Sequence, residues 1–97
     1  MSSECVDNNV YVGRKFFMRY VLSVLMMFTL FRCKDVVIRA RGSNISKAVL
    51  VAESCRYLID AKYTSIDIGS AYIDLGGRRR ILTTIKIVLS APSKSGE

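Results

Sequence analysis

The sequence predicts an α+β domain, in which two helices cover one face of a four-stranded mixed sheet and the terminal hairpin projects from it. Three observations predict this order, β-α-β-α-β-β. Apolar residues recur at helical spacing in two segments. In the short segments that precede each of these, apolar residues indicate strands, and after Lys62 the spacing of apolar residues changes to every second position. The chain has 97 residues, 51% of them hydrophobic, which is enough for one core. We expect a single domain over residues 1–97, with loose tails at 1–8 and 92–97.

The first half of the chain is predicted to form a strand, a helix and a second strand. Val10–Val12 is a short strand that ends at Gly13, and Phe17–Phe31 is a helix. Its apolar run, Val21–Phe31, is shorter than the roughly 20 residues that cross a bilayer, so we expect a buried helix and no membrane partner. In Val36–Arg41, apolar residues alternate with cations, which places one face of this strand on the core.

The second half is predicted to form a helix and a hairpin. Asn44–Ile59 is amphipathic, and we expect Leu50, Val51 and Tyr57 to form an apolar patch away from its buried face. Beyond it, two alternating strands are joined by a tip at Asp74–Arg79, within which Gly76-Gly77 suits a hairpin turn. The apolar side chains of these strands are Ile66, Ile68 and Tyr72, followed by Ile81, Thr83, Ile85, Ile87 and Leu89.

The turn from the second strand into the second helix is the strongest functional signal. Arg39 and Arg41 lie on the strand face opposite the core, and Gly42 permits a tight turn. The side chain at position 43 or 44 can then cap the helix, and Lys47 follows in its first turn. A helix N-terminus offers unpaired N–H groups and partial positive charge, so these cations make a site suited to phosphate.

The charge distribution points to the same ligand. The formal net charge is +7 and the isoelectric point is about 9.7. Cations fall in separate blocks at residues 14–19, 39–47 and 78–80, whereas acids are in excess over 48–77. Such blocks fit an electrostatic footprint on a polyanion, and the alternative is a charge that serves solubility alone.

Several other classes of function are not expected. Cys5, Cys33 and Cys55 are far apart, and the chain has no histidine and no Cys-x-x-Cys spacing. These features predict neither a zinc site nor a disulfide framework, and Cys55 falls on the apolar face of its helix. With scattered acids and no evident general base, we expect no catalysis, cofactor or small-molecule substrate.

Six segments carry a resemblance to a known family: Asn9–Lys15, Met18–Leu22, Val37–Gly42, Ile45–Val49, Gly77–Arg80 and Thr84–Ile87. Through them the chain resembles the archaeal Alba chromatin proteins from Asn9 to Leu89. That family has the same element order, related to the C-terminal domain of bacterial translation initiation factor three. Its members are homodimers that coat double-stranded DNA and also bind RNA, which implies a cytoplasmic, chromosome-associated protein.

The resemblance maps the family's basic pair to Arg14 and Lys15, its strand-end cations to Arg39 and Arg41, and its hairpin arm to residues 74–80. In a two-fold dimer, two such arms could reach minor grooves on either side of the body. With the charge blocks, the candidate nucleic-acid-binding residues are Arg14, Lys15, Arg19, Arg39, Arg41, Asn44, Lys47, Arg78, Arg79 and Arg80.

Three departures from the family pattern matter. Phe16 stands where the family has proline, and we expect its ring to be free to stack on an unpaired base while Phe17 packs into the core. Arg14 replaces a lysine that is acetylated in some members, which leaves Lys15 for any such switch. Leu58 and Ile59 stand near a family phenylalanine that packs dimers on dimers, so cooperative packing is in doubt.

Two functions therefore remain open. One is an architectural, sequence-nonspecific double-stranded DNA-binding protein, and the other is an RNA-binding protein, ribonucleoprotein subunit or RNA chaperone. A purely structural dimerisation module would leave the blocks of cations unexplained. We expect a homodimer, with a heterodimer between paralogues as the open alternative.

Overall fold

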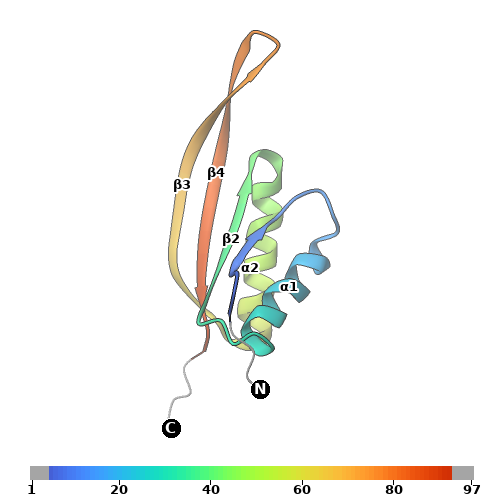
Figure 1. The fold of residues 1–97 in the computed structure, drawn as a ribbon, viewed down its shortest axis with the longest axis vertical. Helices are drawn as coiled ribbons and strands as arrows, with labels where there is room; N and C mark the ends of the chain where they lie inside the picture. The colour runs from blue at the N-terminus through green and yellow to red at the C-terminus, as the bar shows by residue number, and fades with distance from the viewer. Residues whose placement is uncertain (1–4, 93–97) are drawn as a thin grey trace.

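The computed structural model describes residues 5–92, so residues 1–4 and 93–97 of the predicted tails at 1–8 and 92–97 lie outside them. Helices α1 and α2 cover one face of the sheet, and the β3–β4 hairpin extends far beyond the body (Figure 1). The molecule accordingly measures 56 × 26 × 20 Å. Its elements are β1 (Asn9–Tyr11), α1 (Phe17–Thr29), β2 (Asp35–Arg41), a 3-10 turn (Gly42–Asn44), α2 (Ile45–Ile59), β3 (Lys62–Leu75) and β4 (Arg78–Ser90).

The sheet is mixed, with strand order β1-β2-β4-β3, which confirms the predicted fold class. β1 runs parallel to β2, with Asn9 opposite Val37, because α1 forms the crossover between them. β4 is antiparallel to both of its neighbours, β2 and β3. The two strands at the edges of the sheet are therefore the short β1 and the long β3.

The core lies between the helices and the sheet. The alternation predicted for β2 and β4 is confirmed, since Val36 and Ile38 are fully buried on one strand and Ile87 and Leu89 on the other. Both helices contribute mainly small and β-branched side chains, which allow close approach to the sheet. The buried residues of the helices are Val21, Val24, Ala48, Val51, Ala52 and Cys55.

The prediction that the apolar run of α1 is buried is correct for one face of the helix only, on which Leu25, Met27 and Phe28 also pack against the core. Only Val21 and Val24 of this helix are buried, because a single face of it meets the sheet and α2. Met18, Leu22 and Met26, spaced four residues apart, lie on the exposed face. None of the helices within residues 5–92 is both long and apolar enough to cross a membrane.

The start and the outer face of α2 also differ from expectation. Gly42 has φ +61° and makes the predicted tight turn, but no side-chain hydrogen bond from Asn44 caps the helix. Instead, a 3-10 turn leads into α2, and the Ile45 N–H donates to the Gly42 carbonyl. Val51 is fully buried rather than part of an exposed patch, whereas Leu50 and Tyr57 are exposed as predicted.

A disulfide that the sequence did not predict joins Cys5 to Cys33. It ties the segment before β1 to the loop between α1 and β2. The same segment is held by backbone pairing, because the Val37 N–H donates to the Asn8 carbonyl at 2.8 Å. Residues 5–8 are thus attached to the body, although the tail predicted from composition included them.

The hairpin turn is narrower than the predicted tip. Strand pairing continues to Leu75 opposite Arg78, and only Gly76 and Gly77 lie between the strands. Both glycines have positive φ, at +55° and +82°, which is the conformation that a two-residue hairpin turn requires. The arginines that follow the turn therefore belong to a strand rather than to a loop.

Candidate nucleic-acid interface

The sheet face opposite the helices, here called the open face, carries a row of charged side chains. Arg39 and Arg41 on β2 alternate with core residues and so point to this face, as predicted. Lys86 on β4 lies opposite Arg39 in register, and Asp67 on β3 lies opposite Lys86. Lys86 was absent from the candidates predicted from sequence. Its neighbours Ile85 and Ile87 indicate its face, but only the register places it beside Arg39.

These side chains line a groove of about 830 Å³ that crosses all four strands. A groove of this size falls in the range of small-ligand pockets, about 300–1,000 Å³. It reaches Asn44, which lies at the end of the 3-10 turn that precedes α2. The polar side chains that line it are Tyr11, Arg39, Arg41, Asn44, Asp67, Thr84 and Lys86.

Arg39 is held in place within this groove. Its Nε donates a hydrogen bond to Oδ1 of Asn9 at 3.1 Å. Asn9 is held in turn, because its backbone N–H and its side-chain amide both donate to Oδ1 of Asp7, at 3.0 and 3.3 Å. Among the described residues, the terminal nitrogens of Arg39 have no hydrogen-bond partner. They remain free to bind an anion such as phosphate in a bidentate manner.

The structure shows a task for Lys47 that the sequence did not predict, while its role as a phosphate ligand stays a prediction. Its ammonium donates to the carbonyl of Gly13 at 2.7 Å and to that of Lys15 at 2.8 Å. An ammonium has three donors, and two of these are used to fasten the loop between β1 and α1 onto α2. Lys47 therefore positions the loop that carries Arg14 and Lys15.

The side chains of that loop are exposed. Arg14 and Lys15 face solvent, and the Lys15 N–H donates to Oη of Tyr20 at 3.2 Å. Phe16 is 71% exposed, and its ring centroid lies 5.0 Å from that of Phe17, which packs against the core. Both parts of the prediction for this aromatic pair thus agree with the structure, while base stacking by Phe16 stays a prediction.

The three arginines of the hairpin do not act as one block. Because side chains alternate along β4, Arg79 lies on one side of the ribbon and Arg78 and Arg80 lie on the other. The guanidinium of Arg79 lies 5.8 Å from the centroid of the Tyr72 ring, a cation–π contact within the arm. Arg78 and Arg80 are exposed opposite Leu75 and Ile73.

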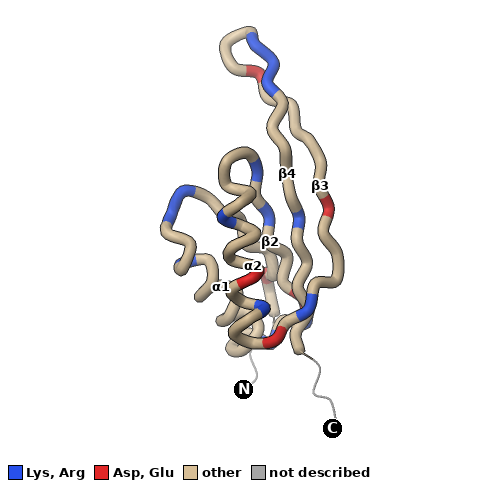
Figure 2. The backbone as a smooth tube through the Cα atoms, turned by 180° about the vertical axis from the view of Figure 1, so that it is seen from behind, with Lys and Arg blue, Asp and Glu red and all other residues tan. Residues whose placement is uncertain are grey.

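Seen from behind, lysine and arginine positions gather at the hairpin tip, on the loop before α1 and along the adjoining parts of β2 and β4 (Figure 2). Arg19 is exposed in the first turn of α1 but does not line the groove. The structure thus joins Arg39, Arg41 and Asn44 in one groove, and it places the loop and hairpin cations around that groove as separate groups.

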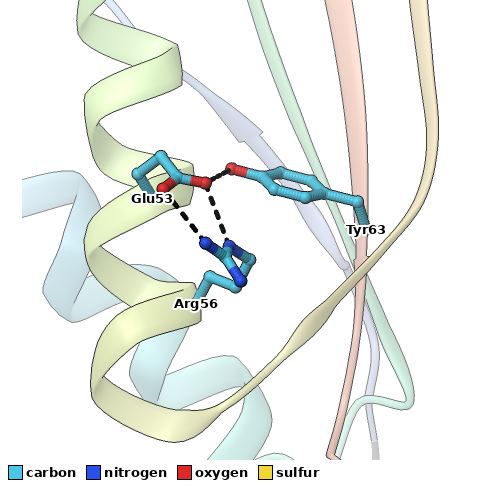
Figure 3. Close-up of polar contacts among 3 residues, drawn as sticks. All are labelled: Glu53, Arg56 and Tyr63. Atoms are coloured by element: carbon cyan, nitrogen blue, oxygen red, sulfur yellow. Dashed lines mark hydrogen bonds and ion pairs between the residues drawn. The ribbon is translucent and has the colours of Figure 1, made fainter.

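A second polar cluster lies away from this groove, where α2 meets the start of β3 (Figure 3). Nε of Arg56 lies 3.0 Å from Glu53, and Tyr63 donates a short hydrogen bond to the same carboxylate. The bonds from Arg56 and Tyr63 lower the pKa of Glu53 below its usual value. Burial, followed by the bond to Glu53, raises the pKa of Tyr63 to about 12. This cluster joins two elements and carries no free cation.

Apart from the disulfide between Cys5 and Cys33, residues 5–92 show no reactive cysteine and no metal-binding cluster. Cys55 is fully buried on the apolar face of α2, as predicted, and burial raises its pKa to about 12, which disfavours the thiolate. No group of three or more His, Cys, Asp and Glu side chains in this part of the chain is placed to hold a metal ion.

Comparison with known proteins finds relatives of one family. The model of the Alba family matches residues 8–70. A protein named "DNA/RNA-binding protein Alba" from Methanococcus maripaludis is 38% identical over 87 residues, which cover 87% of this chain and 98% of that protein. "DNA/RNA-binding protein Alba 1" from Archaeoglobus fulgidus is 40% identical over 86 residues, covering 87% and 96% respectively.

Solved structures agree with these relatives. Alba from Thermoplasma volcanium superposes with a TM-score of 0.80 at 38% identity, over 86% of this chain and 99% of that one. ALBA1 from Trypanosoma brucei superposes with a TM-score of 0.68 over 89% of this chain and 70% of that one. At 22% identity, the second likeness concerns the fold alone.

Proposed function

This chain belongs to the Alba family, and from that membership and the groove on its open face we propose that it binds nucleic acid, chiefly double-stranded DNA, as an architectural, chromosome-associated homodimer. The observation that carries the proposal is the convergence of cations from β2 and β4 in one groove, with Arg39 held by Asn9 and its terminal nitrogens free. Its relatives carry the name "DNA/RNA-binding protein".

The mode of binding follows from the kind of side chain involved. Arginine and lysine neutralise phosphates and release counterions, which gives affinity with little dependence on sequence. Arg78 and Arg80 extend the cationic surface along the arm, and Arg14 and Lys15 extend it along the loop. The exposed face of neither helix presents a set of base-reading side chains such as a recognition helix carries.

The homodimer is supported by apolar surface on the helix side of the molecule. Ile66 and Ile68 on β3 lie opposite the core residues Ile87 and Ile85, yet both are exposed, because β3 is an edge strand beyond the cover of α2. Leu50 and Leu58 are exposed on α2 itself. A second copy that covers this surface would remove several large apolar side chains from water.

The proposal is tested by measuring affinity for duplex DNA at several salt concentrations. With about five to eight phosphates neutralised per dimer, the slope of log affinity against log salt is expected near −5 to −7. A flat response, or a large preference over scrambled sequences, would contradict it. Sedimentation at micromolar concentration tests the dimer separately, and a monomer there would refute that part.

RNA is the second candidate ligand, and exposed Phe16 beside the basic pair favours it, because a free ring can stack on unpaired bases. Competition between duplex DNA, duplex RNA and single strands at one stated salt concentration decides between the two. If RNA displaces duplex DNA at equal strand length, the protein acts chiefly on RNA. A heterodimer with a paralogue would appear as loss of the homodimer on mixing.

A further inference from the structure

The groove on the open face contains one exposed aromatic side chain that the proposed contacts with duplex DNA do not use. Tyr11 lies on β1, opposite Arg39 in register, and its side chain is 70% exposed at the edge of the sheet. No other aromatic ring or guanidinium within residues 5–92 is stacked on it. Bases in a duplex are already stacked and paired, so they offer this ring no partner.

The surroundings of Tyr11 are suited to the phosphate that accompanies a base. Tyr11, Arg39 and Lys86 form one row across three neighbouring strands. Strands lie about 4.8 Å apart, so the backbone positions of Tyr11 and Lys86 are separated by about 10 Å. An aromatic platform is thus followed by two cations in a straight line across the groove.

Both cations of the row are available to a ligand. Arg39 uses only its Nε internally, in the bond to Asn9. Lys86 lies opposite Asp67, yet the two make no ion pair, and the one ion pair within residues 5–92 joins Arg56 to Glu53. Asp67 ends the row with negative charge, so a phosphate backbone is directed to the side of the groove that carries Tyr11, Arg39 and Lys86.

We propose that this groove binds one unpaired nucleotide of a single strand, with its base stacked on Tyr11 and its phosphates on Arg39 and Lys86. The inference rests on the proposed nucleic-acid function and adds a second mode to it. Every base has a flat face, so this site tolerates any sequence and selects single strands over duplexes. It differs from the stacking predicted for Phe16, which lies outside the groove.

The test compares Tyr11→Phe, which keeps an aromatic ring, with Tyr11→Leu, which keeps an apolar side chain of similar size. Anisotropy of labelled twelve-nucleotide oligouridine, oligothymidine and a DNA duplex is measured at one salt concentration. Stacking one base is expected to make Tyr11→Leu about 5- to 150-fold weaker for single strands and less than twofold weaker for the duplex. Tyr11→Phe is expected to bind like the parent.

A spectroscopic readout separates stacking from a general loss of fold. The chain has five tyrosines and no tryptophan, so tyrosine emission reports these rings alone. Binding of a single strand should quench part of this emission in the parent, and Tyr11→Phe should lose that part while keeping its affinity. Lys86→Gln is expected to weaken single-strand binding, and Lys62→Gln, which removes the same charge at the start of β3, serves as the control.

The outcomes distinguish this inference from the proposed function. If Tyr11→Leu and Tyr11→Phe bind single strands equally well, the groove does not stack a base and the inference is overturned. It is also overturned if uridine monophosphate binds as tightly as the oligomers, because the groove would then serve a free nucleotide. If the parent binds single strands but no duplex, the inference stands and the proposed function fails. If it binds the duplex alone, only the inference fails.

Discussion

Lys47→Met is the most informative single substitution, because it separates an anchor from a phosphate ligand. The ammonium holds two carbonyls of the loop between β1 and α1, at 2.7 and 2.8 Å. A hydrogen bond from a charged donor contributes about 1.5–3 kcal/mol when water is excluded. The bond to Gly13 is partly buried and takes the lower end of that range. The bond to Lys15 is exposed and contributes about 0.5 kcal/mol.

The variant should therefore lose about 2 kcal/mol in its free energy of unfolding. For a domain of this size, each kcal/mol lowers Tm by about 4–8 °C, so the expected fall is about 8–16 °C. The matched control is Lys62→Met, which removes the same charge from an exposed position whose side chain makes no hydrogen bond within residues 5–92. Thermal melts by circular dichroism measure both. If the two variants melt together, Lys47 is not an anchor and its predicted role as a phosphate ligand returns.

Three further predictions concern other parts of the molecule. Replacing Arg78, Arg79 and Arg80 by alanine should weaken duplex DNA binding and reduce the salt slope by up to about 5, since a homodimer loses these arginines from both arms, with little change in Tm, because the arm is exposed and remote from the core. The double variant Arg78→Ala/Arg80→Ala should account for most of this effect, because Arg79 is engaged with Tyr72. If the triple variant binds duplex DNA like the parent, the arm is not part of the interface. Phe16→Ala should weaken binding to single-stranded RNA while leaving duplex DNA almost unchanged, and an equal loss on both ligands would show an ordinary packing role. The pKa of Tyr63 is about 12 in the folded protein and near 10 in the unfolded chain, so its contribution to the free energy of unfolding is complete below about pH 10 and is lost between about pH 10 and pH 12. Denaturant unfolding of Tyr63→Phe should lack this loss. An unchanged loss in the variant would assign it to other groups.

The sequence was sufficient for the element order because the periodicity changes sharply after Lys62 and because β2 alternates cleanly between core residues and cations. It could not orient α1, where apolar side chains occur on both faces, so Val24 and Met26 look alike although one is buried and the other exposed. The successful predictions therefore rest on local pattern alone.

The sequence predicted the site residues that depend on local pattern, and it missed the contacts that depend on residues far apart in the chain. Arg39 and Arg41 follow from alternation within β2, whereas Lys86 joins them only through the register of β4. Lys47 looked like a free cation because its partners, Gly13 and Lys15, are 34 and 32 positions away along the chain. No short-range pattern can report a contact across such a separation.

The bond between Cys5 and Cys33 changes the connectivity of the folding chain. Asn9 pairs with Val37 in a parallel arrangement, which ordinarily requires closure of a long crossover before any contact is gained. With the bond formed, β1 and the start of β2 are joined by a covalent path roughly a third as long, and α1 lies inside a closed ring. The shortest strand of the sheet, β1, is thus close to β2 along the covalent structure of the oxidised chain. Oxidation would turn the slowest kind of strand pairing into a nearly local one.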